Sequence, residues 1–410
     1  MSALPHSGYT GSSDRRKSEA RGVSEAMTGV SEAKSVEERL ALIGRNVEEI
    51  ITVDDLRNLL ATGEPIQHYI GFEISGKMHL GSGLMSMSKV RDFMDAGIDC
   101  SVFLADWHTW INDKLGGDRD VIRRIAVNYF KEGFIASLKC FGRDPGKLDF
   151  ILGTELYHCN DDYWATVIDV SKNTTLGRMQ RSITILGRKE GESVDFAKLI
   201  YPALQVADIF AMQVQLAHAG MDQRKAHVIA RDTAMQMKIN ALHNAAGQQI
   251  KPIAIHHHLL MGLRKPKVWP PPTDNVQDFV ASMKMSKSDP SSAIFIHDSE
   301  DEIRQKIRKA FCPPNEVVFN PILDWARHLI FNEPGAELHI PRTPENGGPV
   351  TFTSFEELAE AYSGGSLHPM DLKAGVAEAL IALLAPAREH FQQPGPRAML
   401  EDLDRLIGGG

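Results

Sequence analysis

The spacing of apolar residues along the chain predicts alternating strands and helices. Short apolar runs of strand length are each followed by stretches in which apolar residues recur at helical spacing. The expected strands are 68–74, 100–106, 148–153 and 251–259, and the expected helices lie near 80–96, 119–141, 160–176, 196–216 and 222–238. Strands that are apolar throughout and alternate with helices indicate an α/β domain with a parallel sheet covered on both faces.

The pattern is different before this region. Residues 1–36 are rich in Ser and Gly and poor in apolar positions, which predicts a disordered extension. Ser35 and Glu38 then have capping-box spacing ahead of an apolar periodic run, and Thr52 with Asp55 predicts a second helix start.

The pattern also changes after a proline cluster at 266–272. Shorter helices are expected from there on, near 300–310, 320–331, 354–362, 371–385 and 397–407. We therefore interpret the chain as a parallel-sheet domain at 37–265, a connection at 266–299, and a mostly α-helical domain at 300–410.

Composition narrows the class of protein. The chain has 410 residues, 43% of them hydrophobic, and a formal net charge of -8, so a polyanionic partner would have to bind a local basic patch. No apolar run reaches the ~18 residues of a membrane helix, so we expect no membrane association. The cysteines do not form CxxC pairs, which favours a reducing, cytoplasmic location and excludes a Cys-type zinc site; they are Cys100, Cys140, Cys159 and Cys312.

A glycine-rich turn follows the first predicted strand and is the first candidate for chemistry. Gly76 and Gly81 permit close approach of a ligand to the backbone, and the next helix would offer free N–H groups to a phosphate. His79 lies in the turn and could donate to a phosphoryl oxygen. The alternative is an ordinary strand-to-helix turn with a space-filling histidine, because glycine patterns alone are weak signals.

The segment SMKMSKSD, residues 282–289, is the second candidate. Lys284 and Lys287 are compact mobile charges suited to a polyphosphate, and their small neighbours leave the loop free to close. Phosphoryl-type chemistry depends mainly on positioning and charge neutralisation, so such a loop needs no nucleophile. A solvated surface loop is the simpler alternative for these eight residues by themselves.

Together the two segments resemble the paired signatures of class I aminoacyl-tRNA synthetases. Further blocks are similar, in order and spacing, to tyrosyl-tRNA synthetases of the archaeal and eukaryotic type, and the similarity covers roughly residues 37–392. The blocks read YIGFEISGKMHLG, FLADWHTWINDK, YPALQVADI, GMDQRKAH, KMSKSD and LHPMDLK. The resemblance implies a Rossmann-like catalytic domain followed by a helical anticodon-binding domain.

The resemblance also implies an activity and its partners. Tyrosine would be activated by ATP to tyrosyl-adenylate and then transferred to the 3′ end of tRNA(Tyr), with Mg²⁺ and the loop lysines neutralising the developing charge. A homodimer is the family expectation. The implied catalytic residues are His79, Lys284 and Lys287, and the implied ATP-binding residues are Gly76, His79, Gly81, Ser82, Met285 and Ser286. Ser82 stands where the family usually has a second histidine. More of the transition-state stabilisation would therefore fall to His79 and the two lysines.

The family's tyrosine pocket maps onto six positions, which are Tyr69, His108, Tyr201, Gln205, Asp208 and Gln223. Tyr69 and Asp208 would contact the substrate phenol, and Asp208 would accept its proton. Asp208 is also unusual by its context, because a carboxylate within YPALQVADIFAM is costly to bury without a partner. Tyr201 could instead be a core residue, and His108 could be wall packing beside Trp107 and Trp110.

Contacts to tRNA are expected at three places. Arg178 and Arg181 share one helical face, and Arg224 with Lys225 follows Gln223; both pairs resemble acceptor-end contacts. In the second domain, His368 and Asp371 match positions that read the first anticodon base. An aromatic residue that commonly stacks there is replaced near Asn346, which predicts looser anticodon reading. A solvated surface charge remains the alternative for each single Arg or Lys.

Two other interpretations remain open at this point. A tryptophanyl relative would share the fold and both signatures, although Tyr69 and Asp208 argue against it. A non-catalytic, synthetase-like RNA-binding protein is suggested by Ser82 and the N-terminal extension. A metal site at the HHH run, 256–258, is rejected because consecutive strand residues point to opposite faces.

Overall fold

The structure is a computed structural model, and it describes residues 34–272, 279, 283–285 and 290–408. Residues 35–410 form one compact unit, separate from residues 1–34. The predicted disorder of residues 1–36 therefore lies almost wholly outside the described residues. Among the described residues, no helix is both long and apolar enough to cross a membrane.

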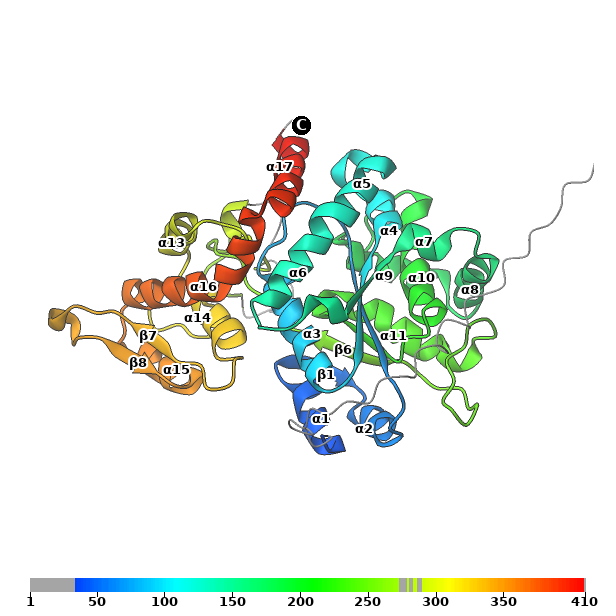
Figure 1. Ribbon diagram of the computed structural model, residues 1–410, viewed down its shortest axis with the longest axis horizontal. Coiled ribbons are helices and arrows are strands. Elements are labelled where there is room, and N and C mark those ends of the chain that lie inside the picture. The colour runs from blue at the N-terminus through cyan, green and yellow to red at the C-terminus, as the bar shows by residue number, and fades with distance from the viewer. Residues whose placement is uncertain (1–33, 273–278, 280–282, 286–289, 409–410) are drawn as a thin grey trace, which may run out of the picture. The chain divides into compact units, whose positions relative to one another are not determined.

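A six-stranded sheet forms the centre of the first part of the chain (Figure 1). Its strands in spatial order are β1 (Val47–Ile51), β6 (Ile253–His257), β5 (Leu216–Gly220), β2 (Gln67–Phe72), β3 (Asp99–Leu104) and β4 (Leu148–Leu152). Five of these strands are parallel, as predicted, but β1 runs antiparallel to β6. The expectation of a wholly parallel sheet was wrong at this edge.

The predicted helices of the first part are present, together with two short helices, at Asp106–Ile111 and Gly153–Tyr157, that were not predicted. They are α1 (Val36–Gly44), α2 (Val53–Ala61), α3 (Ser86–Asp95), α4 (Asp106–Ile111), α5 (Arg119–Ile125), α6 (Lys131–Lys139), α7 (Gly153–Tyr157), α8 (Asp161–Lys172), α9 (Leu176–Ser182), α10 (Phe196–Ala211) and α11 (Arg224–Thr233). π-Helical turns extend two of the predicted helices, at Gly81–Met85 before α3 and Ala126–Phe130 between α5 and α6.

Both predicted helix starts are confirmed by their caps. Ser35 accepts from the backbone N–H of Glu38 at 3.3 Å, and the Glu38 carboxylate accepts from the Ser35 backbone N–H at 2.7 Å. The Thr52 hydroxyl accepts from the backbone N–H of Asp55 at 3.1 Å. These side chains satisfy backbone groups that the first turn of a helix leaves open.

The two faces of the sheet pack against different cores. Ile70 of β2 and Val102 of β3 belong to one core, whereas Tyr69 and Phe103, their neighbours in sequence, belong to the other. Successive strand residues point to opposite faces, so this division follows from the alternation along each strand. The Tyr69 face is covered by α8, α10 and α11, which contribute most of the second core.

The second part of the chain is mostly helical, as predicted. Its elements are α13 (Glu300–Lys309), α14 (Pro321–Trp325), α15 (Phe355–Ser363), α16 (Pro369–Gln392) and α17 (Pro394–Gly408), with a hairpin of β7 (Leu338–Ile340) and β8 (Val350–Phe352). The first core continues into this part and includes Trp325, Leu380 and Leu403. The domain boundaries at 265 and 300 stay a prediction, because the two parts share this core.

Candidate active site

A fully buried carboxylate, Asp208, lies at the centre of a cluster of tyrosines. Its Oδ1 accepts hydrogen bonds from the Tyr157 hydroxyl at 2.8 Å and from the Tyr163 hydroxyl at 2.9 Å. The Tyr157 and Tyr163 rings stack with centroids 4.1 Å apart. Asp208 is on α10, whereas the tyrosines come from α7 and α8, so the cluster exists only because these helices meet over one face of the sheet.

The electrostatic environment of Asp208 opposes its charge. Burial raises the pKa of Asp208 to about 8, although the hydrogen bonds from Tyr157 and Tyr163 act in the opposite direction. Burial also raises the pKa of Tyr69, and the nearby charge of Asp208 adds to that effect. A buried carboxylate without a cationic partner is costly, so the site can gain by offering Asp208 a further hydrogen-bond donor.

A second carboxylate, Glu73, lies just beyond the end of β2. Its Oε1 accepts from the Tyr201 hydroxyl at 2.8 Å and from the Asn112 amide at 2.9 Å. The ring of His108 meets the ring of Tyr201 edge-on, with centroids 4.5 Å apart, and His108 Nε2 is 3.7 Å from Asp208 Oδ2. Burial lowers the pKa of His108 to about 3, so this imidazole is neutral near pH 7.

Two glutamines close the site on the side of α10 and α11. Gln205 donates from Nε2 to Gln223 Oε1 at 3.3 Å, and Gln223 donates to the backbone oxygen of Ile185 at 3.1 Å. Gln205 precedes Asp208 by three residues on α10, so both side chains project from one helical face, as expected.

Several buried polar atoms in this site have no hydrogen-bond partner among the described residues. They are His108 Nδ1 and Nε2, Asn112 Oδ1 and Gln205 Oε1. Most buried polar side-chain atoms in folded proteins are hydrogen-bonded, so four such atoms in one place indicate a site built for a polar ligand. Five of the six predicted pocket residues thus lie around the two carboxylates. The sixth, Gln223, is joined to them by its hydrogen bond with Gln205.

Sequence reasoning missed four members of this site. Tyr157 and Tyr163 lie outside every recognised block, whereas Glu73 and Asn112 lie inside two of them without being singled out. Glu73 could have been found, because it is a lone carboxylate at the carboxyl end of a buried strand. The two tyrosines carried no usable signal, since an aromatic residue on a helix is most often core.

The glycine-rich turn differs from the prediction in its backbone donors. The N–H groups of Gly81 and Ser82 donate to His79 Nδ1 at 3.1 and 3.2 Å, so they are not open to a phosphate. Nδ1 is therefore the acceptor nitrogen, which leaves Nε2 as the ring nitrogen that carries a proton. His79 remains the candidate donor in this turn, but the expectation of free helix N–H groups at Gly81 and Ser82 was wrong.

Ser82 and Gly76 serve the shape of the same turn. The Ser82 hydroxyl accepts from the His79 backbone N–H at 3.2 Å, so the side chain folds back onto its own turn. Gly76 has φ of 117°, a backbone conformation that strongly favours glycine. The roles of Gly76, Gly81 and Ser82 in nucleotide binding stay predictions.

Lys284 is placed near the carboxyl ends of the parallel strands. The Met285 backbone N–H donates to the Leu260 carbonyl oxygen at 2.9 Å, which fixes this segment beside the chain that follows β6. Lys284 Nζ is 3.3 Å from a carboxylate oxygen of Asp222, which follows β5. Met285 is buried. The predicted catalytic Lys287 and the predicted nucleotide contact Ser286 lie outside the described residues.

The turn and the described residues on either side of 286–289 lie at one edge of the sheet. Leu80 N–H donates to the Ile294 oxygen at 3.0 Å, and Ile296 N–H donates to the Met78 oxygen at 3.1 Å. The glycine-rich turn is thereby tied to the segment that follows the KMSKS loop. This is the edge at which open α/β sheets bind their ligands, beyond the carboxyl ends of the strands.

Comparison with known proteins identifies the family. The model of the class I tRNA synthetases for tryptophan and tyrosine matches residues 61–385, which is more than half of the chain. This chain belongs to that family. A tyrosine–tRNA ligase of Thermococcus sibiricus is 56% identical over 371 residues, covering 90% of this chain and 98% of the relative. The tyrosine–tRNA ligase of Pyrococcus abyssi is 55% identical over 372 residues.

Solved structures of relatives agree with the fold of this synthetase. The crystal structure of tyrosyl-tRNA synthetase from Pyrococcus horikoshii, complexed with L-tyrosine, has a TM-score of 0.87 and 53% identity, covering 90% of this chain and 100% of that chain. A tryptophanyl-tRNA synthetase from Aeropyrum pernix has a TM-score of 0.61 at 20% identity, so that likeness concerns the fold alone. The predicted fold class is confirmed.

The four basic residues predicted at the acceptor end of this synthetase are neighbours in space. Lys225 Nζ donates to the backbone oxygen of Arg181 at 2.9 Å, which joins α9 to the start of α11. Arg178 forms an ion pair with Asp232, and Arg224 forms a bidentate pair with Glu49 at 2.7 and 2.8 Å. Part of this positive charge is therefore already neutralised.

The predicted anticodon readers lie together at the start of α16. His368 is the N-cap of this helix, where its Nδ1 accepts from the Met370 backbone N–H at 3.1 Å. Asp371 is partly exposed in the first turn, as suits an acidic side chain at a helix N-terminus. Asn346 lies in a short turn between β7 and β8. The anticodon-reading roles of His368 and Asp371 stay predictions.

Proposed function

We propose that this synthetase is an ATP-dependent tyrosine–tRNA ligase. The observation that carries the proposal is the buried Asp208 with its surrounding tyrosines, because only a substrate with a hydrogen-bond donor at its far end would use such a carboxylate. Relatives that are more than half identical over almost their whole length are tyrosine–tRNA ligases, which supports the same reaction.

In the proposed binding mode, each end of tyrosine faces one carboxylate. The substrate phenol donates to Asp208 near Tyr69, and the ammonium group lies toward Glu73, Gln205 and Gln223. An ammonium group offers three donors, and the partnerless Gln205 Oε1 together with the Glu73 carboxylate supplies acceptors for them. Phenylalanine would leave Asp208 without its new donor, so the pocket discriminates by an unpaired buried group.

Activation of tyrosine joins its carboxylate to the α-phosphorus of ATP and releases pyrophosphate. Negative charge grows on the phosphoryl oxygens, and Lys284 with Lys287 neutralises it while His79 donates from Nε2. Asp222, which is paired with Lys284, is the carboxylate that could hold Mg²⁺ together with the ATP phosphates. When bound, the ion supplies further charge neutralisation.

Transfer moves the tyrosyl group from the adenylate to a ribose hydroxyl at the 3′ end of tRNA(Tyr): an ester bond forms, the bond to the phosphate oxygen breaks, and AMP leaves with release of the hydroxyl proton. The chain contributes mainly positioning to this step. The cluster of Arg178, Arg181, Arg224 and Lys225 is the proposed acceptor-end contact, and His368 with Asp371 is the proposed anticodon contact.

Tryptophan activation is the second function within this family. An indole N–H could also donate to Asp208, but Tyr157 and Tyr163 already occupy the space on one side of that carboxylate. Pyrophosphate exchange into ATP is measured with tyrosine, tryptophan and phenylalanine in turn. We expect exchange with tyrosine alone. No exchange with tyrosine, or equal exchange with phenylalanine, overturns the assignment.

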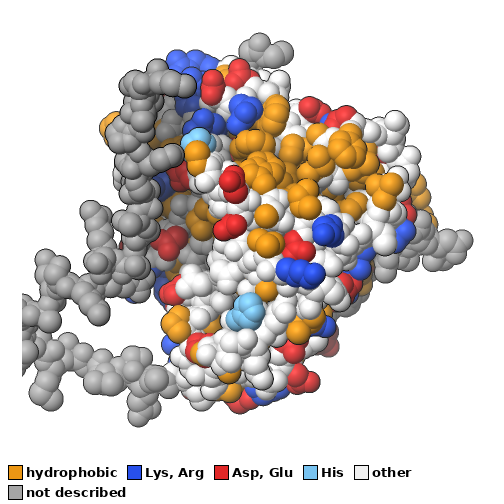
Figure 2. Space-filling view, turned by 90° about the vertical axis from the view of Figure 1, so that its right-hand side faces the viewer, with side chains coloured by type: hydrophobic (Ala, Val, Ile, Leu, Met, Phe, Trp, Pro, Cys, Tyr) orange, Lys and Arg blue, Asp and Glu red, His pale blue; other side chains and the backbone are white. Residues whose placement is uncertain are grey.

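We also propose a cytoplasmic homodimer. Free cysteines at the four cysteine positions fit a reducing compartment. Three tryptophans support the dimer, because Trp107 lies 5.8 Å from Trp110 and 5.6 Å from Trp164 by ring centroids, while Trp110 and Trp164 are each more than a third exposed. Figure 2 shows hydrophobic side chains gathered in a patch on the face that lies at the right of Figure 1, where α8 is labelled.

A further inference from the structure

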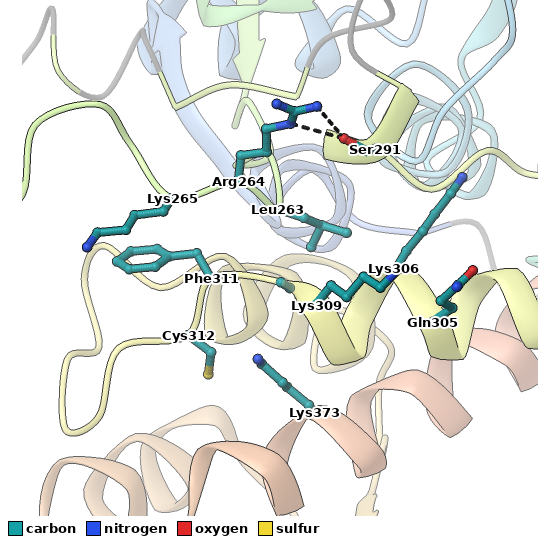
Figure 3. Close-up of a pocket in the computed structure, with 11 residues that line it drawn as sticks. Leu263, Arg264, Lys265, Ser291, Gln305, Lys306, Lys309, Phe311, Cys312 and Lys373 are labelled. Atoms are coloured by element: carbon teal, nitrogen blue, oxygen red, sulfur yellow. Dashed lines mark hydrogen bonds between the residues drawn. The ribbon is translucent and has the colours of Figure 1, made fainter.

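A hollow of about 850 Å³ lies away from the tyrosine pocket, between the chain that follows β6 and the helices α13 and α16 (Figure 3). None of its lining residues is Asp or Glu. Five of them are cationic, and we call these the basic groove: Arg264, Lys265, Lys306, Lys309 and Lys373. Because the chain as a whole carries a net charge of -8, such a local excess of positive charge is notable.

Three of the five cations form no ion pair within the described residues. Lys306 is paired with Asp298 at 2.5 Å, but Lys265, Lys309 and Lys373 form no ion pair with any residue in the described ranges. Lys265 and Lys309 are exposed, and Lys373 is partly buried. Like charges that converge on one hollow repel one another, so an anion bound there would be favoured.

The position of Lys373 also points to an anionic partner. Burial lowers the pKa of Lys373, and its Nζ donates to the backbone oxygen of Arg308 at 3.2 Å. A carbonyl oxygen satisfies one of the three ammonium donors. The remaining donors of a half-buried ammonium group are best used by a negatively charged acceptor.

The dipole of α13 accounts for only part of the positive charge in the groove. Lys306 and Lys309 lie in the last turn of α13, where basic side chains complement the helix dipole. Lys265 and Lys373 come from other segments, and the dipole of α13 gives no reason for them to be there. Their convergence with α13 therefore indicates a shared partner.

The backbone ties this groove to the segment that follows the KMSKS residues. Leu263 N–H donates to the Ser292 oxygen at 2.9 Å, and Phe311 N–H donates to the Leu263 oxygen at 2.7 Å. Arg264 donates to the Ser291 hydroxyl at 2.6 and 3.0 Å, as Figure 3 shows. The groove thus lies between the segment following the KMSKS loop and α16, on which Lys373 is two residues beyond Asp371.

We propose that the basic groove binds the sugar–phosphate backbone of the tRNA. This inference rests on the proposed function, and it adds a contact surface between the loop end and the anticodon end of the chain. Lysines and an arginine held by a serine hydroxyl suit contacts to phosphates. Such contacts position a nucleic acid without reading its sequence. Phe311 is the one aromatic residue in the lining of the groove, and no lining residue is a carboxylate that could accept from a base.

The test replaces the two exposed, unpaired lysines. In the full-length double variant Lys265→Gln with Lys309→Gln, we expect the Kd for tRNA(Tyr) to rise about tenfold. The slope of log K against log salt should become shallower by about 1–2, because each lost phosphate contact contributes about 0.7–0.9 to that slope. Tyrosine-dependent pyrophosphate exchange, which needs no tRNA, should stay within about twofold of wild type. An unchanged Kd and slope overturn the proposal.

A matched control distinguishes the contribution of the groove to tRNA binding from a general effect of surface charge. Lys147 and Lys251 are exposed and do not line the groove, so Lys147→Gln with Lys251→Gln removes the same charge elsewhere. An equal loss of tRNA affinity in this control overturns the proposal. Inorganic pyrophosphate is titrated as a second probe, and tight binding that only the groove variant abolishes would assign the groove to a small anion instead. Loss of exchange in wild type would concern the proposed function and not the groove.

Discussion

At the scale of single residues, Asp208 determines what the pocket can recognise. It is fully buried, and the groups that face it are Tyr69, His108, Tyr157 and Tyr163. None of these is cationic near pH 7, because burial lowers the pKa of His108 to about 3. The carboxylate depends on hydrogen-bond donors alone, and a substrate hydroxyl is one more donor.

Replacing Asp208 with Asn tests this role. The amide keeps the size and one acceptor oxygen but cannot carry the negative charge that a hydrogen bond from the substrate phenol stabilises, and hydrogen bonds to charged groups contribute ~1.5–3 kcal/mol. We expect the ratio of kcat/KM for tyrosine over phenylalanine in pyrophosphate exchange to fall by about 10–100-fold. Asp169→Asn is the matched control, since Asp169 is a buried carboxylate that accepts from the backbone of Lys238 and Ile239. A ratio unchanged in Asp208→Asn contradicts the assignment.

At the scale of secondary-structure elements, an imidazole links the sheet to the helical part. His258 follows β6, and it is hydrogen-bonded at 2.7 Å both to Glu48 of β1 and to Asp324 of α14. Its ring stacks on His328 with centroids 3.9 Å apart and planes at 10°. Although burial alone lowers the pKa of His258, the hydrogen bonds to Asp324 and Glu48 raise it to about 9.

The geometry around His258 suits a bound proton better than a metal ion. Glu48, His258 and His328 offer ligand atoms within 4.8 Å of one another. A metal bound by both imidazoles would have to lie in the plane of each ring, which parallel stacked rings do not allow. An imidazolium between two carboxylates satisfies the same geometry directly.

The raised pKa of His258 predicts a pH-dependent stability. An unfolded histidine titrates near 6.5, so the stabilisation is fully present below about pH 6.5 and is lost as pH rises through about 9. We expect the free energy of unfolding of wild type to fall by on the order of 3 kcal/mol more than that of His258→Gln between these limits. Urea unfolding at both pH values measures this. Burial shifts the pKa of Asp208 and that of Lys89 to about 8, and taking the difference between the two proteins removes both of these titrations. Parallel curves would refute the prediction.

At the scale of the whole molecule, the exposed tryptophans and α8 are the proposed contact between two copies. Ile168 lies one turn beyond Trp164 on α8 and is 60% exposed. Large apolar side chains clustered on one face mark an interaction surface more often than scattered ones do. A two-fold interface would use this patch on both copies.

Charge placed in this patch should separate the copies. We expect wild type to have a mass of about 91 kDa by light scattering, twice the 45.4 kDa of the chain, because closed homodimers are the commonest assemblies. Trp164→Glu with Ile168→Glu should shift the mass to that of one chain. Val318→Glu is the control, since Val318 is 67% exposed and belongs to the second part of the chain. A variant that stays dimeric excludes this surface as the interface.

The sequence by itself determined the elements and the nature of the chemistry. Apolar spacing predicted four of the six sheet strands and the succession of helices, because burial on both faces leaves a local pattern. It missed β1 and β5, which are five residues each and lie among polar or small residues, and it missed the antiparallel direction of β1. Strand direction depends on pairing with β6, some two hundred residues away in the chain.

For the site, a carboxylate within an apolar helix was enough to single out Asp208, because burial of charge is costly wherever it occurs. Its partners could not be found in the same way. Tyr157 and Tyr163 become part of the site only when α7 and α8 pack against α10, and the His79 ring becomes an acceptor only when its turn closes. Local sequence thus specified which groups are present, and tertiary packing decided which of them face one another.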